Sequence, residues 1–307
     1  MGRYRAASLF VFLGLVWGSS FPAVEVGLEY FPALLFAAIR FDVAAVAMVA
    51  YAAATTDRWR PRGRDEWLPA LIGGVFIIAA FHALTYVGQL YVTGAVAAVV
   101  VSLGPVMAAA FAAVLLPDEP FTLSRAVGLV FGVAGVAVIA RPDPSNLLSA
   151  SVVGVALVFV ATVAFNLGTV LTRPFRTDLP VQTMQAWGMV IGAPLLHLAA
   201  AVRGESVAAI QWTVPGVLSL VHLALVCGSL AYLIYFHLLD VLGPVEITLI
   251  GYLEPVFAAA IGWLVLGQAV DVPTAVGFLA IVVGFAIIKR TALRRTIASL
   301  SGGDTAS

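Results

Sequence analysis

The stretch Ile250-Gly-Tyr-Leu-Glu-Pro-Val-Phe-Ala-Ala-Ala260 places an ionisable residue, Glu254, beside a helix-breaking residue, Pro255, inside a long apolar segment. Both residues are energetically costly in such a segment. A similar stretch, Leu103-Gly-Pro-Val-Met-Ala-Ala-Ala110, lies 150 positions earlier in a chain of 307 residues. The sequence therefore indicates a unit that occurs twice.

The composition indicates a membrane protein. Apolar residues make up 62% of the chain and charged residues 10%, whereas soluble domains carry roughly 25% charged residues. We predict an all-α integral membrane protein with ten transmembrane helices. The formal net charge is zero and no basic patch is interleaved with aromatic residues, so nucleic acid is not an expected partner. The single cysteine, Cys227, excludes a disulfide framework within one chain.

Ten apolar stretches are long enough to cross a bilayer, and the first is interpreted as a transmembrane helix rather than a signal peptide. The expected spans are Ala6–Leu28, Phe31–Ala54, Trp67–Leu90, Gly94–Leu115, Leu123–Ala140, Ser149–Leu171, Pro180–Ala201, Thr213–Leu238, Pro244–Leu266 and Val272–Ile288. The connections are short and the chain has no phosphate-binding Gly-x-x-x-x-Gly-Lys motif. We therefore expect neither an ATP-binding domain nor any cofactor.

The distribution of basic residues predicts the orientation. With a cytoplasmic N-terminus, thirteen of the sixteen Lys and Arg residues fall on the cytoplasmic side, and Arg141 and Arg203 fall on the other. Loops rich in Lys and Arg stay in the cytoplasm. Both termini are therefore expected to be cytoplasmic, and the chain is expected in the cytoplasmic (inner) membrane.

The repeat can be followed through two spans of each half. At an offset of 150, Pro105 falls on Pro255, and at an offset of 149, Gly128 and Gly135 fall on Gly277 and Gly284. Five spans per repeat is an odd number, so the second copy enters the membrane from the opposite side. We predict a first five-helix repeat over residues 1–145, an inverted second repeat over 146–290 and a polar cytoplasmic tail over 291–307.

Four patches in this order resemble the EamA-type, ten-helix members of the drug/metabolite transporter superfamily. They are Val16-Trp-Gly-Ser-Ser-Phe-Pro22, Ile39-Arg-Phe41, Ser102-Leu-Gly-Pro-Val-Met-Ala-Ala-Ala110 and Tyr252-Leu-Glu-Pro-Val-Phe-Ala-Ala259. The resemblance covers nearly the whole chain and implies a solute carrier, commonly an exporter of amino acids or other metabolites, with a central pocket between its halves. Family members often carry Gly-Glu after spans 4 and 9, but here the ninth span ends Gly267-Gln268.

Two charged residues are expected near mid-membrane. Arg40 lies some nine residues into the second span and Glu254 some ten residues into the ninth. A charge at that depth costs roughly 2.5–3.5 kcal/mol on insertion scales, so each should face the protein interior. We expect Arg40 to find a carboxylate or backbone carbonyls. Arg40 and Glu254 could have a functional role, in solute binding or proton coupling, or a structural role as anchors between packed helices. Asp42 is expected on a different face of the helix.

Further residues are candidates for lining a central cavity or for acting as hinges. The cavity candidates besides Arg40 and Glu254 are Trp17, Tyr86, Asn166, His222 and Tyr232, with Gln89 and Gln185 as further polar residues. The hinge or kink candidates are Pro22, Pro105 and Pro255, because each removes a backbone donor within a span. The four histidines show no metal-ligand spacing, so no metal site is expected. Glu25 is expected to lie in solvent at a helix end.

The predicted function is secondary active transport of a small organic solute by alternating access. The resemblance implies amino acids or related metabolites as the solute class and export as the direction, neither of which the residues themselves determine. Proton coupling stays open at this point. The alternatives are an uncoupled facilitator of the same solutes and an intramembrane enzyme. The enzyme is disfavoured because an enzyme needs acid, base or metal ligands clustered at one depth. The expected partners are the solute and membrane lipid, and a homo-oligomer is allowed but not required.

Overall fold

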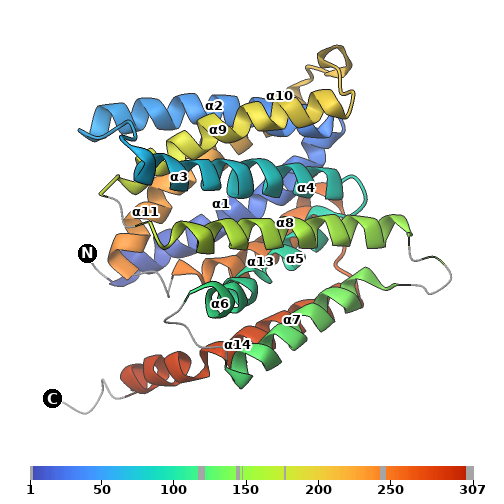
Figure 1. Cartoon of the computed structure of the whole chain (residues 1–307). Helices are drawn as coiled ribbons and strands as arrows, with labels where there is room; N and C mark the ends of the chain where they lie inside the picture. The colour runs from blue at the N-terminus through green and yellow to red at the C-terminus, as the bar shows by residue number, and fades with distance from the viewer. Residues whose placement is uncertain are drawn as a thin grey trace.

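A computed structural model describes residues 3–116, 122–142, 146, 148–175, 178–242 and 247–301. Its regular elements are helices that run roughly along a common axis (Figure 1). The helices of the first half are α1 (Arg3–Leu28), α2 (Ala33–Thr55), α3 (Arg64–Ile72), η1 (Gly73–Ala80), α4 (Phe81–Gly88), α5 (Gly94–Val101), α6 (Gly104–Leu115) and α7 (Leu123–Ala140).

The second half begins after α7. Its helices are α8 (Ala150–Thr172), α9 (Val181–Val202), η2 (Val207–Ala209), α10 (Val214–Val221), η3 (His222–Leu230), α11 (Ala231–Leu242), α13 (Ile250–Leu266) and α14 (Val272–Ser301). Some of these helices continue one another, so that α3, η1 and α4 form one span, and α10, η3 and α11 form another.

The ten-helix membrane fold is confirmed. Among the described residues, eight helical segments are long and apolar enough to cross a bilayer, and Ile250–Leu266 and Val272–Ile288 are shorter apolar helices. The fourth span has its predicted bounds, Gly94–Leu115, and contains a turn at Ser102 and Leu103 between α5 and α6. The predicted start of the ninth span, Pro244, lies outside the described residues. Helix α14 continues past the predicted boundary at Ile288 to Ser301.

Two of the spans contain a π-helical segment, η1 in the third span and η3 in the eighth. They begin at Gly73 and His222, which are 149 positions apart, the same offset as the glycine repeat. A π segment widens the helix and is often found at functional sites. Both π segments therefore belong to the repeated unit, although the residue patterns that mark the repeat gave no sign of them.

Helices that are equivalent in the two halves pack against each other, most extensively α7 with α14 and α2 with α9, and also α5 with α13. Figure 1 shows α7 and α14 side by side at one edge of the bundle. A Cβ at Gly128 would lie 2.6 Å from the carbonyl oxygen of Gly284, and a Cβ at Gly277 would lie 2.6 Å from that of Gly135. Because each contact joins repeat-related positions in crossed order, the pair has the geometry of a local two-fold axis.

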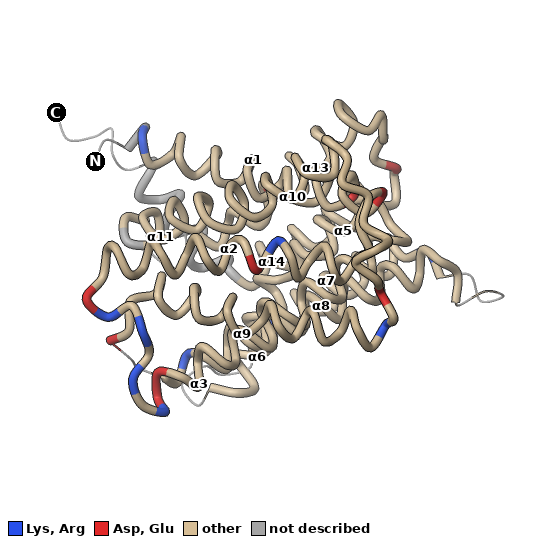
Figure 2. Tube along the Cα trace, turned by 90° about the horizontal axis from the view of Figure 1, so that it is seen from above, with Lys and Arg blue, Asp and Glu red and all other residues tan. Residues whose placement is uncertain are grey.

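Basic residues gather at one end of the bundle (Figure 2). We call this the arginine-rich end and define it by Arg5, Arg58, Arg60, Arg62 and Arg64. The start of α1 and the end of α14 lie at the same end (Figure 1). The largest buried cluster of apolar side chains joins α1, α2 and α4 to α9, η3 and α11, so elements of both halves form one core.

Candidate functional site

Arg40 lies in the middle of α2 and points into the core. Its exposed fraction is 6%, and its Nη1 donates a hydrogen bond to the hydroxyl of Tyr86, 2.8 Å away and 1% exposed. Among the described residues no carboxylate pairs with Arg40, and its Nε has no acceptor. The expected inward orientation is confirmed, but the expected carboxylate or carbonyl partner is wrong. A phenol takes that place, which leaves most of the positive charge uncompensated.

Aromatic rings surround the guanidinium of Arg40. Its central carbon lies 4.4 Å from the ring centroid of Phe41 and 5.8 Å from that of Tyr86. Such contacts stabilise a buried cation without neutralising it. His82, from α4, packs edge-on against Phe41 at 4.5 Å between centroids and lies 6.4 Å from the ring centroid of Tyr86. Sequence reasoning missed His82 and Phe41 as neighbours of the charge.

Glu254 lies on α13, in the first turns of that helix. Helix α1 fixes its backbone, because a Cβ at Gly18 would lie 2.8 Å from the Glu254 carbonyl oxygen. The side chain is half-buried, and among the described residues its carboxylate has no hydrogen bond or ion pair. An uncompensated carboxylate inside a span is costly. Its position therefore requires either a proton or a positively charged partner that binds there.

A polar group on α1 and η3 adjoins the two charges. The Oγ of Ser19 lies 2.8 Å from Nε2 of His222, and the Sγ of Cys227 lies 3.4 Å from the same nitrogen. The hydroxyl of Ser19 donates to the carbonyl of Val16 at 2.7 Å, so Nε2 of His222 is assigned as the donor toward Ser19. Cys227, interpreted from the sequence only as a small buried hydrophobe, is part of this group.

Trp17 and Tyr232 place two aromatic rings beside Cys227 and the other polar residues of α1 and η3. Their ring centroids lie 5.5 Å apart in a T-shaped contact, and Nε1 of Trp17 donates to the carbonyl of Cys227 at 3.3 Å. Both charged residues have neighbours in this region. Gly18, next to Trp17, contacts the backbone of Glu254, and Tyr86, which binds Arg40, belongs to the buried cluster against which Trp17 and Tyr232 pack.

The structure thus brings six of the seven cavity candidates into one region. We call this region the central cluster, and its members are Trp17, Arg40, Tyr86, His222, Tyr232 and Glu254. Asn166 lies elsewhere, on the face of α8 that packs against α6. Its Nδ2 donates to the carbonyl of Thr162 at 2.7 Å and would lie 3.2 Å from a Cβ at Gly104.

The three proline candidates differ in their local structure. Pro105 lies in the first turn of α6, directly after the turn that divides the fourth span. Pro22 and Pro255 lie inside α1 and α13, which continue through them. In both copies a two-residue turn precedes the helix, at Ser102 and Leu103 before α6 and at Thr248 and Leu249 before α13, but Pro105 lies in the first turn of its helix and Pro255 lies farther inside.

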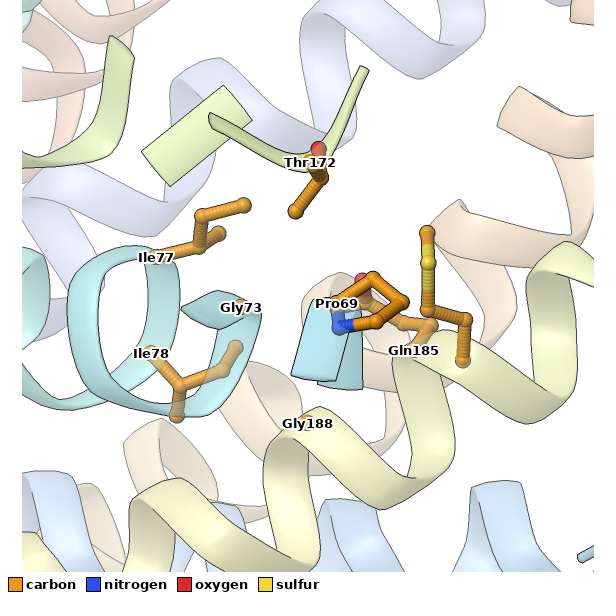
Figure 3. A pocket seen from close by; sticks show the side chains of 8 residues that line it. Pro69, Gly73, Ile77, Ile78, Thr172, Gln185 and Gly188 are labelled. Atoms are coloured by element: carbon orange, nitrogen blue, oxygen red, sulfur yellow. The ribbon is translucent and has the colours of Figure 1, made fainter. Parts of the chain in front are cut away.

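A small cavity lies between the third, sixth and seventh spans (Figure 3). Its lining residues Pro69 and Thr172 belong to the parts of α3 and α8 nearest the arginine-rich end. Its volume of about 40 Å³ is room for a few water molecules. The π segment η1 contributes Gly73, Ile77 and Ile78 to its wall, and Gln185 of α9 lies on its border. The Nε2 of Gln185 is buried and has no acceptor among the described residues. Gln185 also approaches Tyr232, which links the cavity to the central cluster.

At the opposite end of the bundle, Glu25 connects three elements. Its Oε2 accepts a hydrogen bond from the backbone nitrogen of Gly94 at 2.8 Å, and its Oε1 accepts one from Nε2 of Gln268 at 2.5 Å. The expectation that Glu25 is a solvated helix end is wrong. Gln268 follows Gly267, whose φ of 67° ends α13 and turns the chain toward α1. We call this contact the Glu25 latch.

Comparison with known proteins identifies the family. The sequence model of the EamA-like transporter family matches the chain twice, over residues 5–141 and 152–290. The protein belongs to the EamA-like transporter family. The first matched segment covers α1 to α7 and the second covers α8 to α13 and most of α14.

Similar proteins include transporters over nearly the full length. The uncharacterized transporter YvbV of Bacillus subtilis is 27% identical over 305 residues, covering 99% of this chain and 98% of YvbV. A protein of Streptantibioticus cattleyicolor named as a probable terminal-alkyne amino-acid exporter is 30% identical, covering 97% and 98%. The uncharacterized inner membrane transporter YedA of Escherichia coli K12 is 27% identical over 84% and 86%.

A solved crystal structure supports the fold. It aligns with a TM-score of 0.65 and covers 95% of this chain and 99% of the other, at 20% sequence identity. At that identity the likeness concerns the arrangement of helices alone. The EamA-like protein is therefore an integral membrane transporter by family, and its chemistry has to be argued from the central cluster.

Proposed function

We propose that this EamA-like protein is a secondary active transporter that exports a small zwitterionic solute, an amino acid or a related metabolite, by alternating access. One observation carries the proposal. Arg40 in the first half and Glu254 in the second are opposite charges without an ionic partner among the described residues, and each lies on a helix that packs against α1. A solute with both a carboxylate and an ammonium group would compensate both charges, which few other small molecules can do.

In this proposal each part of the central cluster has a role. Arg40, held by Tyr86, binds the solute carboxylate, because a guanidinium presents several donors to it. Glu254 binds the ammonium group. Trp17 and Tyr232 supply aromatic surface for an apolar side chain. The relative named as an amino-acid exporter supports the same class of solute.

Alternating access requires that the cluster opens to one side at a time. The cavity beside Gln185 supports an approach from the arginine-rich end, and the Glu25 latch supports closure at the other end. Pro22, Pro105 and Pro255 are proposed as the points where the helices bend during the exchange. By the distribution of basic residues, the arginine-rich end is proposed to be cytoplasmic, with both termini on that side of the inner membrane.

Proton coupling is the part of the proposal that depends on Glu254. A carboxylate without a partner can take a proton when no solute ammonium group is present, so that solute and proton exchange at one site. The alternative is a facilitator that lets the same solutes run down their gradient. Proteoliposomes distinguish the two, because coupled flux changes the lumenal pH and responds to an imposed pH gradient, whereas facilitated flux does neither.

The solute class is tested by ligand-induced thermal stabilisation of the purified protein. The panel contains each amino acid together with its decarboxylated amine and its deaminated acid. We expect one or more amino acids to raise the melting temperature and both truncated analogues to fail at the same concentration. Equal stabilisation by an amine or an acid would contradict two-point recognition by Arg40 and Glu254.

The role of Glu254 is tested by Glu254→Gln, with Glu29→Gln as the matched control because Glu29 is exposed at the far end of α1. We expect Glu254→Gln to lower solute flux in proteoliposomes by at least tenfold and to remove its dependence on a pH gradient, while the protein stays monodisperse. The control should transport like the wild type. Full activity of Glu254→Gln would refute the role of this carboxylate.

A further inference from the structure

A polar pair lies on the outer surface of the membrane-spanning part, away from the central cluster. Asp42 of α2 and His197 of α9 form a hydrogen bond of 2.7 Å between Oδ2 and Nε2. Their side chains are 48% and 42% exposed. Asp42 lies two residues after Arg40, but Arg40 points inward and Asp42 points outward.

The depth of this pair makes its exposure costly. Asp42 lies nine residues after the start of α2 and His197 five residues before the end of α9, which places them about 8–14 Å below the helix ends. At that depth the surroundings of a monomer are lipid acyl chains. Ionisable residues in a span almost always face the protein interior or pair with one another, because hydrocarbon offers their remaining polar atoms no partner.

The side chains around the pair have the composition of a helix–helix interface. On α2 they are Val43 and Val46, and on α9 they are Leu198 and Val202, with exposed fractions of 40%, 73%, 60% and 83%. Membrane interfaces combine close apolar packing with a few polar residues that form hydrogen bonds between helices. In the described structure nothing covers this face.

We propose that this face binds a second copy of the chain, with the two Asp42–His197 pairs in contact at the centre of a two-fold symmetric dimer. Two copies inserted with the same topology can be related by a two-fold axis along the membrane normal. In that symmetry each residue meets its own counterpart at the same depth. The pair is self-complementary, because the second ring nitrogen of His197 and the second carboxylate oxygen of Asp42 have no partner among the described residues.

This occupant fits better than lipid or an unrelated membrane protein. A lipid headgroup would have to sink to the depth of Asp42, and an unrelated protein would need a matching donor and acceptor at the same height. A second copy provides both by symmetry. The proposal does not depend on the transported solute, since the central cluster of each copy lies on the other side of α2.

The first test is cysteine cross-linking in liposomes at low protein density. Val46→Cys is placed on the proposed face, and Leu279→Cys on α14 is the control, because Leu279 is 61% exposed away from that face. The wild type is the background, since Cys227 is 3% exposed. We expect oxidation to link Val46→Cys into a covalent dimer and to leave both others monomeric. Absence of that dimer, or equal linking of Leu279→Cys, would overturn the proposal.

The second test measures the dimer fraction by single-molecule photobleaching across a range of protein densities. The double variant Asp42→Leu/His197→Leu makes the face apolar and should raise the dimer dissociation constant about tenfold, which corresponds to the loss of two interhelical hydrogen bonds. Asp42→Asn keeps an acceptor and should stay within about threefold of the wild type. A wild type that bleaches in single steps at all densities, or a double variant that dimerises like the wild type, would overturn the proposal.

Discussion

Arg40 donates a hydrogen bond of 2.8 Å to the hydroxyl of Tyr86, and both side chains are buried. The phenol holds the guanidinium in place, but it carries no negative charge. The arrangement therefore positions a cation in the core of an EamA-like transporter and leaves its charge available to a bound anion.

Tyr86→Phe is predicted to weaken solute binding more than it disturbs folding. The change leaves the ring and removes only the acceptor for Arg40, and a hydrogen bond to a charged group contributes about 1.5–3 kcal/mol. We expect the apparent affinity for the solute to fall about tenfold with a small loss of thermal stability. Arg40→Lys, which keeps the charge but loses the planar guanidinium and its array of N–H donors, should also lower solute flux. Unchanged transport by both variants would argue that Arg40 is a structural anchor.

The Glu25 latch is predicted to stabilise the closed state at the end opposite the arginine-rich end. Glu25→Ala removes the acceptor for both Gly94 and Gln268, so the population open at that end should rise about thirtyfold if each bond contributes about 1 kcal/mol. Hydrogen exchange of the amides near Gly94 and Gln268 measures this opening. Glu29→Ala, at an exposed site on the same helix end, is the control. Equal protection in Glu25→Ala and the wild type would contradict the latch.

The close contact of α7 and α14 predicts contrasting effects for two glycines of the second half. Gly277→Ala would place a Cβ 2.4 Å from a side-chain carbon of Ile139 and 2.6 Å from the Gly135 oxygen. We expect it to destabilise the protein by about 1–3 kcal/mol. Gly251→Ala meets nothing within 4 Å in its helix and should be neutral or slightly stabilising. Thermal unfolding in detergent compares them, and equal melting temperatures would contradict the packing.

Asp271 is predicted to make a small, acid-sensitive contribution at the start of α14. Its Oδ1 accepts from the Thr274 nitrogen at 2.9 Å and its Oδ2 pairs with Arg141. Hydrogen bonds from Thr274, followed by the charge of Arg141, hold the pKa of Asp271 below its usual value. A carboxyl group whose pKa is lowered on folding stabilises the folded state at pH values above its unfolded pKa. This stabilisation is lost as the pH falls through the folded pKa.

The measurement for Asp271 is the melting temperature as a function of pH. The wild type should lose more stability than Asp271→Asn between about pH 5 and pH 3, where an aspartate titrates. The difference should be small because the side chain is half-exposed. A wild type and a variant with parallel pH profiles would show that this carboxylate does not stabilise the helix start.

The membrane class, the ten spans, the repeat and the family could be predicted because they depend on local composition and order. Apolar length predicts a span whatever its neighbours are. A proline or glycine at a fixed offset is visible along the chain, as for Pro105 and Pro255. The depth of Arg40 and Glu254 also follows from counting residues. These features can be predicted without knowing which helices are neighbours in the folded protein.

The partners of the charged residues depended on tertiary contacts between helices distant in sequence. Tyr86 binds Arg40 across 46 positions, and Gln268 binds Glu25 across 243. Neither contact has a sequence pattern, so Glu25 was wrongly expected in solvent. The two π segments, η1 and η3, also could not be predicted from the sequence, because a π turn depends on how the helix packs rather than on a residue signature.

The sequence by itself determined that this chain spans the membrane as two related halves and carries one central charge in each half, because hydropathy, repeat offsets and residue counting are properties of the chain. Only the tertiary structure decided that Arg40 binds Tyr86, that neither Arg40 nor Glu254 has an ionic partner among the described residues, and that Asp42 and His197 meet on the outer face. Those outcomes depend on how α1, α2, α9 and α13 rotate and cross, which is set by the packing of many small contacts.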